Sequence, residues 1–297
     1  MRFIKYKWFF FGFSLLLLIP GLISLFLNGL KLSVDFTGGS LLEVQSSAPI
    51  PTEDFFSIAQ SKELELSTIQ NLGNNSYLLR LKPLTQEQND DFKKTLSEKY
   101  PDIKENRFET VGPVVGAELT RKALMAVGVA SLFIIIYIAW SFRKIPKPYS
   151  SWKFGASAVI ALLHDAVFVL GLFSILGHYF KVEVDSLFVT ALLTVIGFSV
   201  HDTIVVFDRV RENLPKMPKS SFEAIVDFSL TETLARSLNT SLTVVLTLTA
   251  LLLFGGESIR WFVVALLVGI VSGTYSSIFN ASPILVMWET PRSKKDK

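Results

Sequence analysis

Long apolar runs alternate with short polar segments over most of the chain. Six runs approach the roughly 20 residues that an α-helix needs to cross about 30 Å of hydrocarbon. They occupy residues 8–27, 124–140, 154–176, 186–207, 241–254 (which extends further on its polar N-terminal side) and 261–288. The pattern predicts a polytopic α-helical membrane protein with six transmembrane helices.

The segment between the first two runs has the pattern of a soluble domain. Strands are predicted at residues 41–46, 67–72, 76–82 and 103–111, and helices at 52–62 and 85–100. The second helix opens with Thr85 and Gln88 in capping-box spacing. The order β-α-β-β-α-β predicts a small ferredoxin-like α+β domain. We expect four parts: residues 1–30 (N-terminus and first span), 31–119 (this domain), 120–290 (spans two to six) and 291–297 (a basic tail).

Lysine and arginine predict the orientation in the membrane. They gather before the first span, after the second, after the fourth and after the sixth, which places all four clusters on one side. By the positive-inside rule this side is cytoplasmic, with both termini, and residues 31–119 are extracytoplasmic. The first run is too long for a signal-peptide core and no small-x-small cleavage site follows, so it is expected to remain as an anchor.

Composition excludes several classes of function. Half of the residues are hydrophobic and only 19% are charged, which is typical of membrane proteins, and the net charge of +3 gives no nucleic-acid surface. There is no cysteine, so disulfides and thiolate metal sites are excluded. No P-loop, His-Glu-x-x-His or Gly-x-Ser-x-Gly motif occurs. We expect no enzyme activity, no cofactor and no metal.

Ionisable residues inside the spans are the main functional candidates. His201 and Asp202 interrupt the fourth run, and an Asp at a helix centre costs about 2.5–3.5 kcal/mol unless it faces protein or water. Arg236 opens the polar side of the fifth run, and hydroxyl residues follow it, among them Thr240, Ser241 and Thr243. We hypothesise that Asp202 carries a proton along this polar path with Arg236 as its gate. The alternative is a permanent Asp202–Arg236 ion pair that fixes two helices.

A second pair, His164–Asp165, interrupts the third run. An interhelical hydrogen-bonding clasp and a role in ion coupling are both open for this pair. His201 precedes Asp202 by one residue, so the two side chains point about 100° apart on a helix and His201 is given a secondary role.

Two further patterns concern packing. Ser220 and Glu223 have capping-box spacing before Phe222, Ile225 and Val226, which predicts a short amphipathic helix at the membrane surface. In the sixth run, the small-xxx-small spacing of glycines 269 and 273 predicts a face where a neighbouring helix comes close.

Five motifs resemble the SecD/SecF family of protein-export membrane proteins, within the wider RND superfamily. They are SVDFTGGS at 33–40, VGPVVGAEL at 111–119, ALLHD at 161–165, DTIVVFDRVREN at 202–213 and GTYSS at 273–277. Asp-Phe-Thr-Gly-Gly, together with the small domain, is similar to the SecF branch rather than to SecD. The family-motif residues are Asp35, Gly38, Gly39, Gly112, Pro113, Gly116 and Glu118.

The resemblance implies a six-helix half of an RND-type bundle in the bacterial cytoplasmic (inner) membrane. Its implied partners are SecD in a heterodimer, the SecYEG channel with SecA, YajC, the translocating polypeptide and membrane lipid. The implied function is late-stage protein export driven by an ion gradient, with Asp202 as the intramembrane acid and Arg236 as its partner. Relatives commonly have Asn where this chain has His201.

Two other functions stay open, half of a small-molecule or lipid exporter of the RND kind and a passive scaffold of the Sec channel. The residues also leave open whether the coupling ion is H⁺ or Na⁺, because an Asp lined by hydroxyl oxygens suits either.

Overall fold

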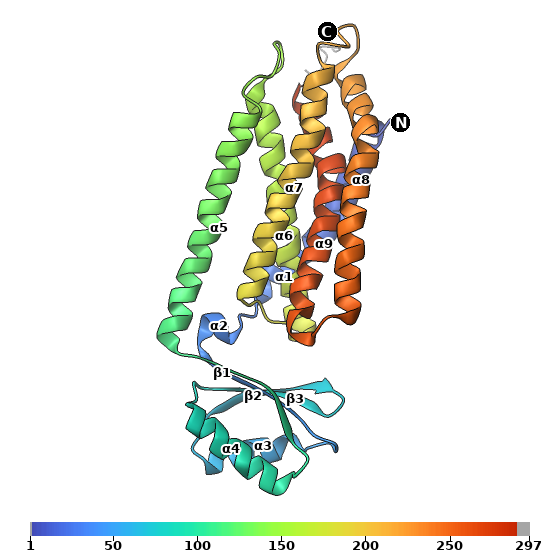
Figure 1. Cartoon of the computed structure of the whole chain (residues 1–297). Helices are drawn as coiled ribbons and strands as arrows, with labels where there is room; N and C mark the ends of the chain where they lie inside the picture. The colour runs from blue at the N-terminus through green and yellow to red at the C-terminus, as the bar shows by residue number, and fades with distance from the viewer. Residues whose placement is uncertain (1, 290–297) are drawn as a thin grey trace. The chain divides into compact units, whose positions relative to one another are not determined.

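The computed structural model of the chain describes residues 2–289 and divides into two compact units. One unit comprises residues 1–31 and 126–297, and the other comprises residues 32–125. The predicted basic tail at 291–297 lies outside the described residues. Each unit is described separately below, and both are visible in Figure 1.

Within residues 2–289, six helical segments are long and apolar enough to cross a membrane, as the hydropathy pattern predicts. Their helices are α1 (Lys7–Asn28), α5 (Pro113–Ser141), α6 (Ser151–Phe180), α7 (Ser186–Asn213), α8 (Phe222–Phe254) and, for the last span, α9 (Arg260–Ser276) continuing into α10 (Ser282–Glu289). A π-helical turn, Ser277–Ala281, joins α9 to α10. The most buried spans are those of α6, α7 and α9 with α10, which form the centre of the bundle.

Small residues allow the central helices to come close, as predicted for the sixth span. A Cβ atom added at Gly273 of α9 would lie 3.0 Å from the Ser199 Cβ of α7. At the α1–α6 contact, a Cβ at Gly171 would lie 2.8 Å from the Gly21 Cα. Contacts this short have no room for a side chain, so these glycines set the helix spacing.

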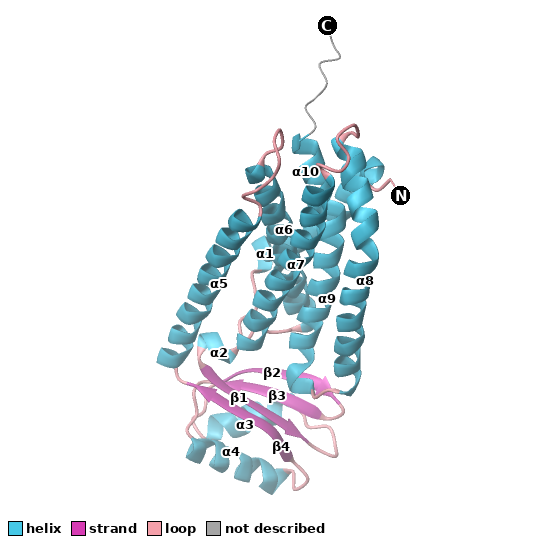
Figure 2. Cartoon of the chain, turned by 45° about the horizontal axis from the view of Figure 1, so that its top comes forward, coloured by secondary structure: helices cyan, strands magenta, loops and turns pink. Residues whose placement is uncertain are grey.

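The second unit contains a four-stranded antiparallel sheet in the order β2-β3-β1-β4. Its strands are β1 (Gly39–Gln45), β2 (Leu66–Gly73), β3 (Ser76–Leu81) and β4 (Lys104–Val111), with α3 (Thr52–Ser61) and α4 (Gln86–Lys99) in the crossovers. Both helices cover one face of the sheet (Figure 2), where Phe55 and Phe92 are fully buried. Thr85 and Gln88 form the predicted capping box of α4. The ferredoxin-like prediction is confirmed.

The prediction of a separate surface helix after the fourth span is wrong. α8 runs without interruption from Phe222 to Phe254, so this segment is the first turn of the fifth span. Its N-cap is Ser221, whose hydroxyl accepts a hydrogen bond from the Ala224 N–H, and not Ser220 as the capping-box spacing suggests. The apolar residues Phe222, Ile225 and Val226 are buried, which explains their helical spacing by packing within the bundle.

Candidate functional site

Asp202 lies in the central part of the bundle on α7 and is only 2% exposed. The Thr274 hydroxyl of α9 lies beside its carboxyl group and donates to the Ile270 carbonyl oxygen at 2.9 Å. Its Oδ2 atom, however, has no hydrogen-bond partner within residues 2–289. A buried carboxylate oxygen without a donor is unfavourable, so this side chain is able to accept a proton, a cation or a further donor.

A series of hydroxyl groups connects the surroundings of Asp202 to α8. The Thr274 and Ser241 hydroxyls are 2.5 Å apart, and Ser241 is buried. Ser237, one turn earlier on α8, is also buried, and its Oγ has no hydrogen-bond partner among the described residues. Three helices therefore surround a small polar region beside Asp202.

The other predicted members of the polar path face elsewhere. Thr240 and Thr243 are exposed, and the Thr243 hydroxyl donates to the Thr240 carbonyl oxygen. Because both side chains are exposed, they contribute no group to an internal path. His201 is likewise exposed, which agrees with its predicted rotation away from Asp202.

Arg236 does not contact Asp202, and the alternative of a permanent ion pair between them is not formed in the described chain. The buried face of α8 includes Thr233, Ser237 and Ser241, which recur every four residues. Arg236 precedes Ser237 by one residue and is therefore turned about 100° away from that face. Its side chain is exposed.

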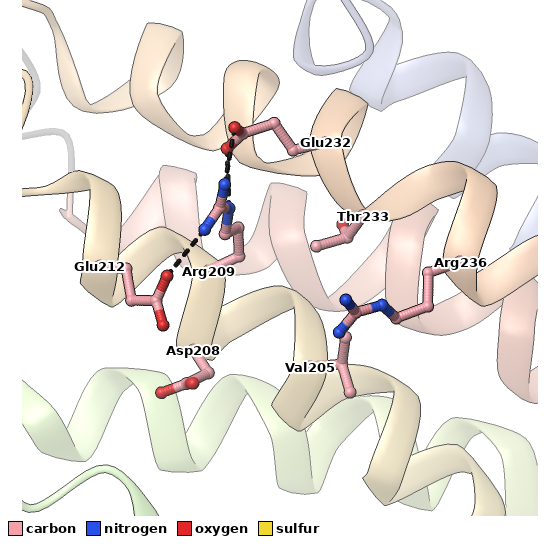
Figure 3. Close-up of a pocket in the computed structure, with 7 residues that line it drawn as sticks. All are labelled: Val205, Asp208, Arg209, Glu212, Glu232, Thr233 and Arg236. Atoms are coloured by element: carbon pink, nitrogen blue, oxygen red, sulfur yellow. Dashed lines mark hydrogen bonds and ion pairs between the residues drawn. The ribbon is translucent and has the colours of Figure 1, made fainter.

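Arg236 instead lines a cavity of about 350 Å³ between α7 and α8. The residues around it are Val205, Asp208, Arg209 and Glu212 of α7, and Glu232, Thr233 and Arg236 of α8 (Figure 3). Two arginines and three carboxylates thus share one polar space. Val205 follows Asp202 by three residues, so the cavity lies about one helical turn from Asp202 toward the C-terminal end of α7.

The second predicted pair, His164 and Asp165 on α6, forms a hydrogen-bonded clasp. Asp165 is fully buried. Its Oδ2 accepts hydrogen bonds from Ser199 and Ser276, each at 2.5 Å. Its Oδ1 lies 3.2 Å from the Ser272 hydroxyl and 3.0 Å from His164 Nδ1. This one carboxyl group links α6 to α7 and α9.

The far side of His164 extends the clasp to a fourth helix. Its Nε2 lies 2.5 Å from the Ser14 hydroxyl of α1, and the Asn280 Nδ2 donates to the same hydroxyl at 2.9 Å. Asn280 belongs to the π-helical turn, a type of irregularity that often occurs at functional positions. Ser14 and Asn280 were missed by the sequence analysis, although an amide inside an apolar span is a signal that could have found Asn280.

The predicted family-motif residues lie in the second unit, where the two N-terminal motifs pack together. Gly38 and Gly39 have φ values of +72° and +130° at the start of β1. A Cβ atom at Gly38 would lie 3.0 Å from the Pro113 Cα, and one at Gly116 would lie 2.9 Å from the Gly38 nitrogen. Only glycine fits both this backbone conformation and this spacing.

The remaining motif residues have simpler surroundings. Asp35 lies in α2 (Val34–Thr37), and its N–H donates to the Ser33 hydroxyl. Glu118 forms an exposed ion pair with Lys122 at 2.8 Å. Gly112 has no atom within 4 Å of an added Cβ. Within residues 2–289, no group of three His, Cys, Asp or Glu side chains is arranged to hold a metal ion.

Comparison with known families and proteins gives consistent matches. Residues 91–291 match the family described as protein export membrane protein SecD/SecF, C-terminal, and residues 23–50 match the SecD/SecF GG motif. The chain is 47% identical to the protein translocase subunit SecF of Thermobaculum terrenum, over 96% of this chain and 93% of that protein. It is 43% identical to SecF of Anaerolinea thermophila, over 96% and 92%.

Longer relatives match over part of their length. The chain is 38% identical to the protein translocase subunit SecDF of Bacillus subtilis, over 97% of this chain and 38% of that protein. The crystal structure of SecDF from Thermus thermophilus, a translocon-associated membrane protein, superposes with a TM-score of 0.84 at 33% identity, again over 97% of this chain and 38% of that one.

Proposed function

This chain belongs to the SecD/SecF family of protein-export membrane proteins, and from that premise we propose that it is the SecF subunit of an ion-driven export device. In this proposal, Asp202 binds and releases an ion within the membrane. The energy of the ion gradient then promotes late steps in the translocation of a polypeptide. The chain itself carries out no covalent chemistry.

The observation that carries the proposal is the state of the Asp202 carboxyl group. It is buried in a helix long enough to span a membrane, yet one of its oxygens lacks a partner among residues 2–289. Most buried polar atoms have at least one hydrogen-bond partner, so an unpaired oxygen on a buried carboxylate requires an explanation. The Thr274 and Ser241 hydroxyls beside it can both donate and accept, which suits an ion in transit.

In this proposal, movement of the Arg236 side chain gives the bundle a second conformational state. In the conformation described above it lies in the cavity beside Val205, about one helical turn from Asp202. When Asp202 loses its ion, the negative charge attracts the guanidinium, and when Asp202 is neutral that attraction disappears. Two positions of Arg236 would couple the charge of Asp202 to the packing of α7 against α8, because the two states then differ in their contacts.

The partners and location follow from the longer relatives. SecDF of Bacillus subtilis contains a region similar to this whole chain within 38% of its length, so we infer that a separate SecD subunit supplies the rest. The pair would then act beside the SecYEG channel with SecA, with YajC as a further partner, in the bacterial inner membrane. Both termini and the cavity between α7 and α8 would face the cytoplasm, as the distribution of Lys and Arg predicts.

The test is export by membrane vesicles that contain the chain with SecD, SecYEG and SecA. We expect Asp202→Asn to abolish the part of export that depends on an ion gradient, while co-purification with SecD is unchanged. Thr240→Val, at an exposed position on α8, is the matched control and should behave as the parent. If Asp202→Asn vesicles respond to the gradient as the parent does, the chain is a passive scaffold and the proposal is wrong.

A further inference from the structure

Glu232 is the partner that helix geometry offers to Arg236. The two residues are four apart on α8, and a glutamate placed four residues before a basic residue is the favourable order for an ion pair on a helix. The structure does not form this pair. The Glu232 carboxylate is turned to α7, where Arg209 Nη2 and Nε donate to its two oxygens at 2.7 and 2.8 Å (Figure 3).

The other carboxylates of the cavity are also held by arginines other than Arg236. Arg209 Nη1 donates to Glu212 at 2.8 Å, and Arg211 lies 2.5 Å from Asp208. No ion pair of Arg236 occurs in the part of the chain that the structure describes. Each of the three acids thus forms an ion pair with Arg209 or Arg211, and none of them pairs with Arg236.

We propose that Arg209 is a positioning residue for Arg236. By holding Glu232 with two charge-assisted hydrogen bonds, which are stronger than neutral ones, it prevents Glu232 from capturing the guanidinium. Arg236 then remains able to reach Asp202 when that carboxylate becomes charged. The inference deepens the proposed function and rests on it, because it assumes that Arg236 must respond to Asp202.

A purely structural role for Arg209 is the competing account. Arg209 and Glu232 join α7 to α8, and their loss would loosen that contact. Asn213 of α7 makes two further hydrogen bonds to α8. Its Nδ2 donates to Glu232 at 2.7 Å and to the Ser229 hydroxyl at 3.0 Å. The contact between the helices therefore has a second attachment that remains when Arg209 is replaced.

The two accounts differ in what happens when Glu232 is also removed. In Arg209→Gln, Glu232 keeps the hydrogen bond from Asn213 but loses both bonds from Arg209, so its uncompensated negative charge competes for Arg236. In the double variant Arg209→Gln/Glu232→Gln the competing charge is gone, although the ion pair between α7 and α8 is still missing. Positioning therefore predicts rescue by the second substitution, whereas a structural role predicts none.

The experiment measures gradient-dependent export in vesicles that contain the chain with SecD, SecYEG and SecA. We expect Arg209→Gln to lower it about tenfold, the effect of one competing charge-assisted hydrogen bond, and the double variant to recover most of that loss. Arg143→Gln is the matched control. It removes a cytoplasmic-side arginine that lies over Trp140 and should leave export unchanged. Co-purification with SecD shows that each variant is folded and assembled.

The inference is overturned if the double variant is no better than Arg209→Gln, or if Arg209→Gln exports as the parent does. Glu232→Gln alone gives a second check that does not depend on the folding of Arg209→Gln. It should lose much less than Arg209→Gln, and equal losses would indicate a structural role. Failure of the proposed function itself looks different, because Asp202→Asn would then keep its response to the gradient.

Discussion

Asp165 and Asp202 are both buried carboxylates in neighbouring helices, but their hydrogen bonding differs. Asp165 has four polar neighbours, the hydroxyls of three serines and the His164 ring. Asp202 has the Thr274 hydroxyl beside it and an Oδ2 atom without a partner in residues 2–289. From this contrast we propose a structural role for Asp165 and a change of charge at Asp202.

This contrast predicts the effect of Asp165→Asn. The amide can accept at only one of its two ends, so hydroxyl donors lose their acceptor, and each such loss in a buried site costs about 1–3 kcal/mol. We expect a clear fall in the thermal unfolding temperature of the purified protein in detergent. Thr247→Val, which removes a hydroxyl bonded to its own helix, should have no effect. An unchanged unfolding temperature for Asp165→Asn would contradict the structural assignment.

A residue-scale prediction in the α+β unit concerns pH. Hydrogen bonding by Lys99 and then by Tyr100 lowers the pKa of Asp54, so this stabilisation is present above the ordinary Asp pKa and is lost as pH falls through the lowered value. The same bond to Asp54, with some burial, raises the pKa of Tyr100 to about 12. That contribution is complete below the ordinary Tyr pKa and is lost as pH rises through about 12.

The measurement is the absorbance of tyrosinate as a function of pH, taken as the difference between the parent and Tyr100→Phe. We expect a midpoint near about 12 in the parent and a lower midpoint in Asp54→Asn, because the neutral amide no longer stabilises the protonated phenol. The same midpoint in both backgrounds would show that Asp54 does not control Tyr100.

The sequence identified both intramembrane acids because a charge inside an apolar run is visible without a structure. It could not show how each acid is satisfied. Ser199 and Ser272 bind Asp165 from two other helices, and the rotation of those helices is set by packing over the whole bundle. For the same reason the sequence pattern predicts one path along the hydroxyl residues of α8, whereas only Ser241 of the three predicted positions is buried.

At the scale of elements, the close contact of α7 and α9 positions the clasp around Asp165. Gly273 lies against Ser199, and Ser199 donates to Asp165. Any group that separates the two helices should therefore weaken the clasp. The tight spacing was predictable from the small residues of the sixth span, whereas the π-helical turn Ser277–Ala281 and the continuity of α8 depend on tertiary contacts.

Replacing Gly273 by alanine tests this contact. The added Cβ would lie 3.0 Å from the Ser199 Cβ, and overpacking of this kind typically costs about 1–3 kcal/mol. Gly128 of α5 is the matched control, because nothing lies within 4 Å of its added Cβ and alanine is favoured over glycine in a helix by about 1 kcal/mol. Thermal unfolding should show Gly273→Ala less stable than Gly128→Ala. The reverse order would contradict the packing described here.

At the scale of the whole molecule, the chain combines a helical membrane unit with a small α+β unit, and both were predictable because each has its own residue pattern. The six apolar runs and the β-α-β-β-α-β order are local features of the sequence. The cavity between α7 and α8 was not predictable, since its charges come from two helices and are distributed by the contacts of Arg209.

The central claim is that an ion bound at Asp202 drives export, and the most direct measurement imposes one ion gradient at a time. Vesicles that contain the complete machinery are given a proton gradient or a sodium gradient, and the rate of export is recorded as each gradient is increased. We predict a rate that rises with one of the two gradients in the parent and stays flat in Asp202→Asn. A parent rate that responds to neither ion, or an equal response in Asp202→Asn, would contradict the account.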